Sequence, residues 1–127
     1  MKLLLKLLLV LFASTALAQP AAYPSRAVRL IVPYGPGGVS DIMGRVIAQK
    51  MTELLGQPMV VENRPGAGGM LGTGFVAKSA PDGYTIVLSS LSAYAIGPRL
   101  VKDAPYDPVA DFTAIGGVAI APTILTV

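Results

Sequence analysis

The sequence of 127 residues contains no cysteine, no histidine and no tryptophan. Without cysteine the chain has no disulfide bonds, no lipid attachment through a thiol and no thiolate metal site. Without histidine it lacks the commonest general base and a frequent metal ligand, which argues against many enzyme classes. We expect no metal and no cofactor.

Charged residues are also scarce, at 13%, whereas hydrophobic residues make up 53%. This balance predicts a packed core rather than a disordered chain. Two of the ten basic residues, Lys2 and Lys6, flank or interrupt the apolar run Leu3–Phe12, and a small-residue site follows at Ala16–Ala18. This pattern predicts a secretory signal peptide over residues 1–18. A membrane anchor is the alternative, but the run is shorter than the roughly 20 residues that span a bilayer.

The predicted mature region, 19–127, is nearly neutral. Removal of two of the ten basic residues leaves eight basic residues against seven acidic ones. No basic patch remains that would suggest binding to nucleic acid. An exported chain without disulfides must be stabilised by its own packing, so we expect one α/β unit with a good core.

The stretch Tyr34–Asp41, with the sequence YGPGGVSD, lies between a short apolar run and an amphipathic one. The run Val28–Pro33 predicts a buried strand, and the apolar residues after the turn recur at helical spacing. Ser40 or Asp41 stands at the expected helix N-cap, and Gly56 at the expected C-cap. Such a turn lies at the carboxyl end of its strand, where open α/β sheets bind ligands, and a helix start favours anions. The stretch therefore predicts a place to hold a small negative group.

A second strand and glycine turn follow. Met59–Asn63 predicts a short strand that leads into the turn Arg64–Gly69 and then into a helix from about Met70. Gly72 and Gly74 weaken this helix by roughly 1 kcal/mol each relative to alanine. Small residues are expected there if the helix packs closely or if its start touches a ligand.

The third unit is less regular. Tyr84–Leu88 predicts a strand that ends in Ser89 and Ser90, and a weak helix follows around Ser92–Leu100. The order β-α-β-α-β predicts a parallel sheet whose three turns converge on one rim. The remaining apolar runs, Phe112–Ile120 and Thr123–Val127, predict two more strands, and the last one stops without a cap or polar tail, as expected for an incomplete chain.

Neither glycine turn matches a nucleotide-binding fingerprint. Gly66-x-Gly68 is followed by Leu71 where GxGxxG requires its third glycine, and GxxxxGK is absent. No GxSxG elbow is present either, which argues against an α/β hydrolase. Two interpretations stay open at this point: a site for a small anion, or two tight connections without a ligand.

Three ordered segments closely resemble the periplasmic receptors of tripartite tricarboxylate transporters, often called the Bug family. They are YPSRAVRLIVPYGPGGVSD, GQPMVVENRPGAGG with AKSAPDGYT behind it, and YDPVADF at Tyr106–Phe112. The resemblance covers Tyr23 to Val127 and implies an α/β, periplasmic-binding-protein-like fold in which two lobes close like a venus flytrap. Family members are far longer, so this chain would supply only the first β-α-β-α-β part of lobe one.

The resemblance implies a periplasmic receptor, not an enzyme, that captures a small di- or tricarboxylate or a related organic acid and delivers it to membrane permease subunits. In the family, loops after the first strands hold the ligand carboxylate with backbone N–H groups, small hydroxyls and water. The matching positions are Gly37, Gly38, Ser40 and Asp41 in the first turn, Ala67, Gly68 and Gly69 in the second, and Ser89 and Ser90 in the third.

Two charged residues near these turns have competing interpretations. Asp41 would repel a carboxylate, so it either serves the helix as a first-turn acid or orients a water or a ligand donor. Arg64 could clamp a carboxylate, or it could be solvated or pair with Glu62. Val39 stands where the family usually has Ser or Thr, which removes one hydroxyl. The rival functions are a non-functional fragment of such a receptor and an α/β enzyme.

Overall fold

The computed structural model describes residues 22–120. The elements in chain order are β1 (Val28–Val32), α2 (Val39–Leu55), β2 (Met59–Asn63), a 3₁₀ turn (Ala67–Gly69), α3 (Met70–Ala77), β3 (Thr85–Val87), a π-helical turn (Ser92–Ile96) and α4 (Gly97–Leu100). This order confirms the predicted alternation of strands and helices. The predicted signal peptide and the predicted strand Thr123–Val127 lie outside the described residues.

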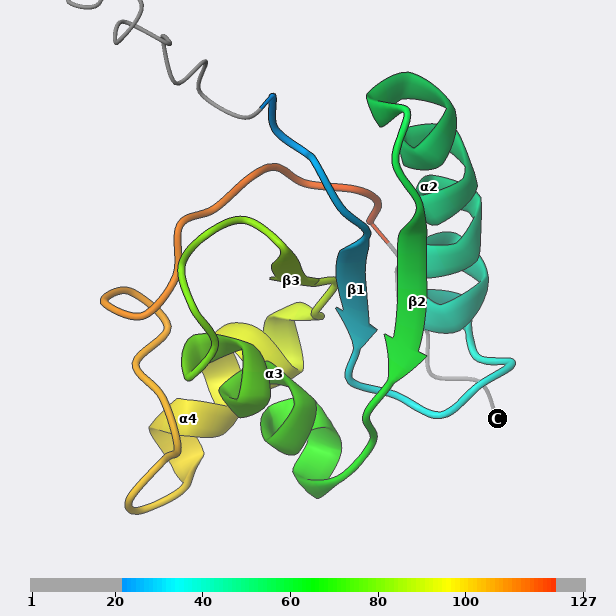
Figure 1. The fold of residues 1–127 in the computed structure, drawn as a ribbon. Coiled ribbons are helices and arrows are strands. Elements are labelled where there is room, and N and C mark those ends of the chain that lie inside the picture. Colours follow the sequence, from blue (N-terminus) through cyan, green and yellow to red (C-terminus); the bar gives the residue numbers. More distant parts are fainter. Residues whose placement is uncertain (1–21, 121–127) are drawn as a thin grey trace, which may run out of the picture.

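The three strands form a parallel sheet in the order β2-β1-β3 (Figure 1). Val32 of β1 lies beside Asn63 of β2, and Ile31 lies beside Val87 of β3. Since all three strands run in the same direction, their carboxyl ends meet at one rim of the sheet. The alternating order of elements therefore produces the convergence of turns that the sequence predicts.

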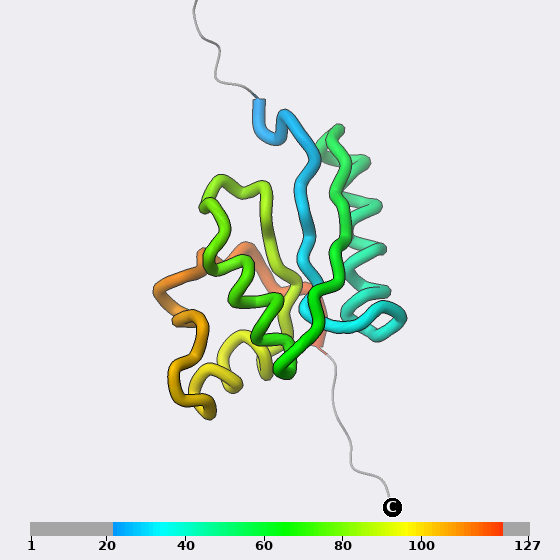
Figure 2. Tube along the Cα trace, turned by 60° about the horizontal axis from the view of Figure 1, so that its bottom comes forward, coloured from blue at the N-terminus to red at the C-terminus, as the bar shows by residue number. Residues whose placement is uncertain are grey.

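Helices cover both faces of the central strand. Figure 2 shows α2 on one side of β1 and β2, and α3 on the other. Val28 and Leu30 pack with Ala48 of α2, whereas Arg29 and Ile31 alternate to the opposite face. A strand that is covered on both faces needs apolar side chains on both, which explains the nearly continuous apolar run VRLIV.

Two glycines in the helices mark where the backbone approaches the sheet closely. A Cβ atom at Gly44 of α2 would lie 2.9 Å from Val32 Cγ2. A Cβ atom at Gly72 of α3 would lie 2.5 Å from the carbonyl oxygen of Arg64 and 2.8 Å from Pro33 Cβ. The expectation of close packing at Gly72 is therefore confirmed, and it accounts for a residue that weakens an isolated helix.

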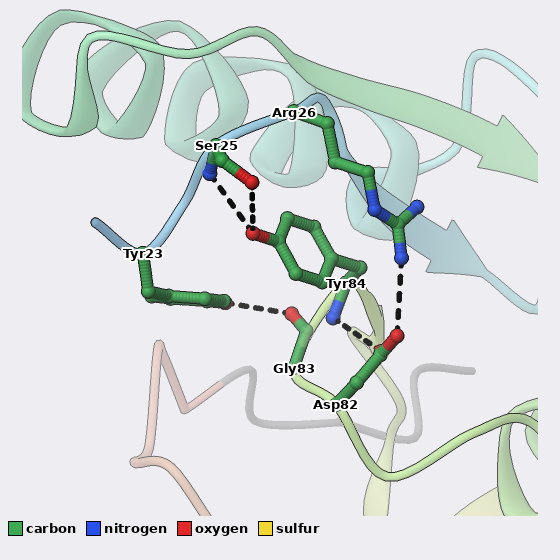
Figure 3. A network of polar contacts seen from close by, with 6 residues as sticks. All are labelled: Tyr23, Ser25, Arg26, Asp82, Gly83 and Tyr84. Carbon is green, nitrogen blue, oxygen red and sulfur yellow. Dashed lines mark hydrogen bonds and ion pairs between the residues drawn. The ribbon is translucent and has the colours of Figure 1, made fainter. Parts of the chain in front are cut away.

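The end of the sheet opposite the turns is joined by side-chain contacts between the segment before β1 and the turn before β3 (Figure 3). The Tyr23 hydroxyl donates to the Gly83 carbonyl oxygen at 2.7 Å, and Arg26 pairs with Asp82 at 3.0 Å. The Arg26 guanidinium also lies 3.9 Å from the centre of the Tyr84 ring. These contacts hold β3 beside β1 at its amino end.

Some predicted boundaries are wrong. The N-cap of α2 is Gly38, not Ser40 or Asp41, because Asp41 lies in the first turn and bonds backward to the Gly37 N–H. The C-cap at Gly56 is confirmed, with a left-handed φ of 68°. The first strand ends at Val32, one residue before the predicted Pro33, and β3 is shorter than the predicted Tyr84–Leu88 by one residue at each end.

The predicted strand Phe112–Ile120 is also wrong, because this segment has no regular secondary structure. Beyond Phe112, which is half-buried, its apolar side chains are exposed, with Ile115 at 83% and Ile120 at 97%. A strand requires a neighbouring strand to accept its backbone hydrogen bonds, and no such partner lies beside this segment within residues 22–120. Among the same residues, no helix combines the length and the hydrophobicity needed to cross a bilayer.

Candidate functional site

The turns that follow the three strands contact one another at the rim of the sheet. The Tyr34 hydroxyl, after β1, shares a hydrogen bond with the Ser90 hydroxyl, after β3. The Asn63 amide, at the end of β2, donates to the Tyr34 carbonyl oxygen at 3.0 Å. A Cβ atom at Gly69 would lie 3.1 Å from the Tyr34 hydroxyl oxygen and 2.8 Å from Ala93 Cβ. All nine predicted site residues lie on these turns or at their edges.

The first turn leads into the start of α2 and offers backbone donors there. Gly37 has a φ of 84°, and Gly38 is extended before the first helical residue. The Gly37 N–H donates to Asp41 at 2.9 Å, so this donor is already used inside the chain. The N–H groups of Val39 and Ser40 have no acceptor among residues 22–120, as expected for the first turn of a helix.

Asp41 is buried at this turn, with 4% of its surface exposed. Its Oδ2 accepts hydrogen bonds from the Gly37 N–H and from Arg45 Nε at 3.1 Å. Its Oδ1 accepts one from Asn63 Nδ2 at 3.0 Å and pairs with Arg45 Nη2 at 3.0 Å. The Arg45 hydrogen bond, followed by those of Gly37 and Asn63, lowers the pKa of Asp41 to about 2. The carboxylate is therefore ionised and fully bonded, which favours the first-turn role over a direct ligand contact.

The second turn has an unusual backbone. Four consecutive residues have positive φ angles: Gly66 at 135°, Ala67 at 48°, Gly68 at 64° and Gly69 at 96°. The Gly69 N–H donates to the Gly66 carbonyl oxygen at 2.9 Å, whereas the N–H groups of Ala67 and Gly68 have no acceptor in the described part of the chain. A non-glycine residue in the left-handed region costs of order 1–3 kcal/mol, and such strain occurs most often at functional sites.

Arg64 precedes this turn but is occupied by other contacts. Its Nε bonds to Glu62 Oε1 at 2.5 Å, and its guanidinium lies 3.8 Å from the centre of the Phe75 ring. Arg29 bonds to the same carboxylate, and the hydrogen bond from Arg29, more than that from Arg64, lowers the pKa of Glu62. Of the two interpretations of Arg64, the pairing with Glu62 is the one observed.

The two predicted serines of the third turn belong to a network of hydroxyl groups. The Ser89 hydroxyl bonds to Thr73 Oγ1 at 3.1 Å, which donates in turn to the Gly69 carbonyl oxygen at 2.9 Å. Ser90 bonds to Tyr34 and to the Ser92 hydroxyl at 3.0 Å. The second and third turns are therefore linked, and so are the first and third.

Sequence reasoning missed two residues that hold the rim together, Asn63 and Thr73. Asn63 stands at the end of a predicted strand and directly before a predicted glycine turn, and that position could have drawn attention to it. Thr73 lies inside α3 and is fully buried, and no signal in the sequence separates it from a packing residue. Its neighbour Ser89 is 16 residues away, so only the tertiary structure brings the two hydroxyls together.

The rim is open within residues 22–120. Gly37, Gly38, Ala67 and Gly68 are all exposed. Two open hollows of about 420 and 410 Å³ lie elsewhere, between α2 and β2 and beside α4. No predicted site residue lines either hollow. The candidate site is consequently a surface of converging turns and not a closed pocket.

Comparison with known proteins identifies related chains. The family described as "Tripartite tricarboxylate transporter family receptor" matches residues 43–127. Protein BugT of Bordetella pertussis is 44% identical over 126 residues, which are 96% of this chain and 39% of BugT. The chain thus spans about two fifths of the length of that relative. The matched family consists of receptors and not of enzymes.

Solved structures agree in fold. The periplasmic binding protein BugD is 42% identical and matches with a TM-score of 0.68 over 71% of this chain and 30% of BugD. MatC from Rhodopseudomonas palustris, with bound malate, is 40% identical and matches with a TM-score of 0.68 over 72% of this chain and 31% of MatC. The periplasmic-binding-protein-like fold that the resemblance implies is therefore confirmed for the matched part.

Proposed function

Because the chain belongs to the tripartite tricarboxylate transporter receptor family, we propose that it carries the first ligand-binding turns of a periplasmic receptor for a small carboxylate. The malate bound to MatC supports a di- or tricarboxylate or a related organic acid as the ligand class. The predicted signal peptide over residues 1–18 supports export to the periplasm. Membrane permease subunits are the partners that would receive the ligand.

The observation that carries the proposal is that a glycine turn follows the carboxyl end of each of two neighbouring parallel strands, β1 and β2. Among residues 22–120, the N–H groups of Val39, Ser40, Ala67 and Gly68 have no acceptor. A carboxylate accepts such hydrogen bonds, and each bond to a charged group contributes about 1.5–3 kcal/mol. Two or three of them would bind the anion without an ion pair.

The neighbouring charges support binding by neutral donors. Arg45, the basic residue nearest the first turn, pairs with Asp41, and Arg64, the basic residue nearest the second, pairs with Glu62. A ligand carboxylate that bound either arginine would have to displace a carboxylate already present. Binding to the backbone N–H groups displaces no carboxylate, and the glycines let a ligand approach these groups closely.

A titration of the chain with malate tests the proposal. Because the turns form an open surface, binding is measured at millimolar concentrations by amide shifts in ¹H–¹⁵N spectra. Malate should shift the amides of Val39, Ser40, Ala67 and Gly68, whereas its dimethyl ester, which has no carboxylate, should leave them unchanged. If malate shifts amides elsewhere and leaves these four unchanged, the proposed site is wrong.

Two substitutions separate the backbone donors from the arginine. Gly38→Val should abolish the malate shifts, and its Cβ is tolerated by the fold, because the nearest atom would be the Gly35 carbonyl oxygen at 3.7 Å. Arg64→Ala should change the affinity by less than about 1 kcal/mol, as expected for a partly exposed charge. Gly116→Val, outside both turns and without a neighbour within 4 Å, is the matched control. Loss of binding in Arg64→Ala with retention in Gly38→Val would overturn the proposal.

A further inference from the structure

The side-chain amide of Asn63 bonds to three different groups at the end of β2. Its Nδ2 donates to the Tyr34 carbonyl oxygen and to Asp41 Oδ1, both at 3.0 Å. Its Oδ1 accepts a hydrogen bond from Arg45 Nη2 at 3.3 Å. Both amide protons and the amide oxygen are therefore used, and all three partners belong to the first turn or to the first helical turns of α2.

These bonds form a continuous path from the second strand to the first glycine turn. The Asn63 amide donates a hydrogen bond to the Asp41 carboxylate, and this carboxylate accepts another from the Gly37 N–H at 2.9 Å. Asn63 also holds the turn at a second point, the Tyr34 carbonyl oxygen. The turn is thus fixed at both of its ends to a residue 22 or more positions further along the chain.

We propose that Asn63 is a positioning residue for the carboxylate site, since it presets the orientation of the Val39 and Ser40 N–H groups. This inference rests on the proposed function. A preorganised set of donors binds an anion more tightly than a mobile one, because less conformational freedom is lost on binding. An amide suits the position, since it donates and accepts at the same time without adding a charge beside Asp41.

The charged surroundings of position 63 make a pH test possible. Asp41 and Arg45, both from α2, are the ionisable groups that face the Asn63 amide. The flanking side chains of Glu62 and Arg64 contact the Phe75 side of the sheet instead, together with Arg29. A carboxyl group introduced at position 63 would therefore interact mainly with Asp41 and Arg45.

Two variants distinguish positioning from simple structural support. Asn63→Ala removes all three bonds, and Asn63→Asp keeps the shape but places a second carboxylate against Asp41. Two close carboxylates share one proton when the pH falls, and the protonated form donates a hydrogen bond again. Asn63→Asp should therefore regain one of the two lost donors in mild acid, whereas Asn63→Ala should regain neither at any pH. Gln57→Glu, which makes the same amide-to-acid change beyond the end of α2, is the matched control.

The first readout needs no ligand. In ¹H–¹⁵N spectra of the chain, the Gly37 amide proton should move upfield in both variants at neutral pH, because its hydrogen bond to Asp41 is loosened. It should return toward its original position in Asn63→Asp between pH 7 and 5, and in Asn63→Ala it should not. An unchanged Gly37 signal in both variants would overturn the inference.

The second readout is malate binding, expressed relative to the unmodified chain at the same pH so that ionisation of malate cancels. Both variants should bind about tenfold more weakly at pH 7, as for the loss of one hydrogen bond. Asn63→Asp should recover at least part of that loss at pH 5. A Gly37 signal that responds as expected while malate affinity stays constant would overturn the positioning role. If malate fails to bind even the unmodified chain, the proposed function fails, and the Gly37 response still decides whether Asn63 fixes the turn.

Discussion

The hydroxyl groups of Tyr34 and Ser90, 56 residues apart in the sequence, share a hydrogen bond across the carboxyl end of the sheet. The bond joins the turn after β1 to the turn after β3, and the Ser90 hydroxyl continues it to Ser92. The Tyr34 carbonyl oxygen also accepts a hydrogen bond from the Asn63 amide, so this one residue contacts the end of β2 and the turn after β3. Tyr34 is therefore the point where the three turns of the candidate site are linked.

Tyr34→Phe should lower the free energy of unfolding by about 0.5–1.5 kcal/mol, the usual contribution of one hydrogen bond. It should also weaken the malate-induced amide shifts, because the third turn loses its link to the first. Tyr23→Phe is the matched control, since it removes a hydrogen bond to Gly83 at the opposite end of the sheet (Figure 3). Urea unfolding and the malate titration of both variants check the prediction; equal effects on malate binding would contradict it.

Gly72→Ala should destabilise the chain although alanine is the better helix former. The gain in helix propensity is about 1 kcal/mol, whereas overpacking costs typically 1–3 kcal/mol. The added Cβ would lie 2.5 Å from the Arg64 carbonyl oxygen, a backbone atom that cannot rotate away. We expect a net loss in urea unfolding, and none for Gly35→Ala, whose Cβ would meet nothing within 4 Å. A stabilised Gly72→Ala variant would show that α3 can move away from β1.

Asp41 should contribute stability that depends on pH. Its pKa is lowered from 3.8 to about 2 in the folded chain, so its ionised form is favoured by folding. This stabilisation is fully present above the unfolded pKa and is lost as the pH falls through the folded pKa. Asp41→Asn should therefore be less stable than the unmodified chain at neutral pH, and the difference should shrink between about pH 4 and pH 2. Thermal unfolding across this range checks it; a difference that does not depend on pH would contradict it.

The signal peptide also stays a prediction. An exported chain should be cleaved between Ala18 and Gln19, since small residues at positions 16 and 18 suit the signal peptidase. The intact mass of the chain from a periplasmic extract measures this directly. Replacing Ala18 with a large residue, as in Ala18→Tyr, should block processing and leave the precursor in the membrane fraction. Recovery of a soluble periplasmic chain that retains Met1 would contradict the prediction.

Local patterns were sufficient for most of the elements. The sequence predicts the strand Met59–Asn63 with its observed bounds, and the C-cap at Gly56 follows from the conformational freedom of glycine after an amphipathic run. These features depend on neighbours within a few residues. The sequence pattern places the start of α2 too late. The Asp41 carboxylate accepts the Gly37 N–H from inside the helix, so the helix starts without a separate side-chain cap.

The amino-acid sequence by itself determined the order of strands and helices, the glycine turns and the family to which the chain belongs. Only the tertiary structure decided which polar groups remain free at those turns. Asn63 reaches Asp41 and Tyr34, and Thr73 reaches Ser89, each through a contact between separate elements. Such contacts arise because parallel strands bring their carboxyl ends together, whatever their distance along the chain. The prediction of a strand at Phe112–Ile120 is wrong for a related reason. A strand also depends on a neighbour from elsewhere in the chain, and no strand lies beside this segment among the described residues.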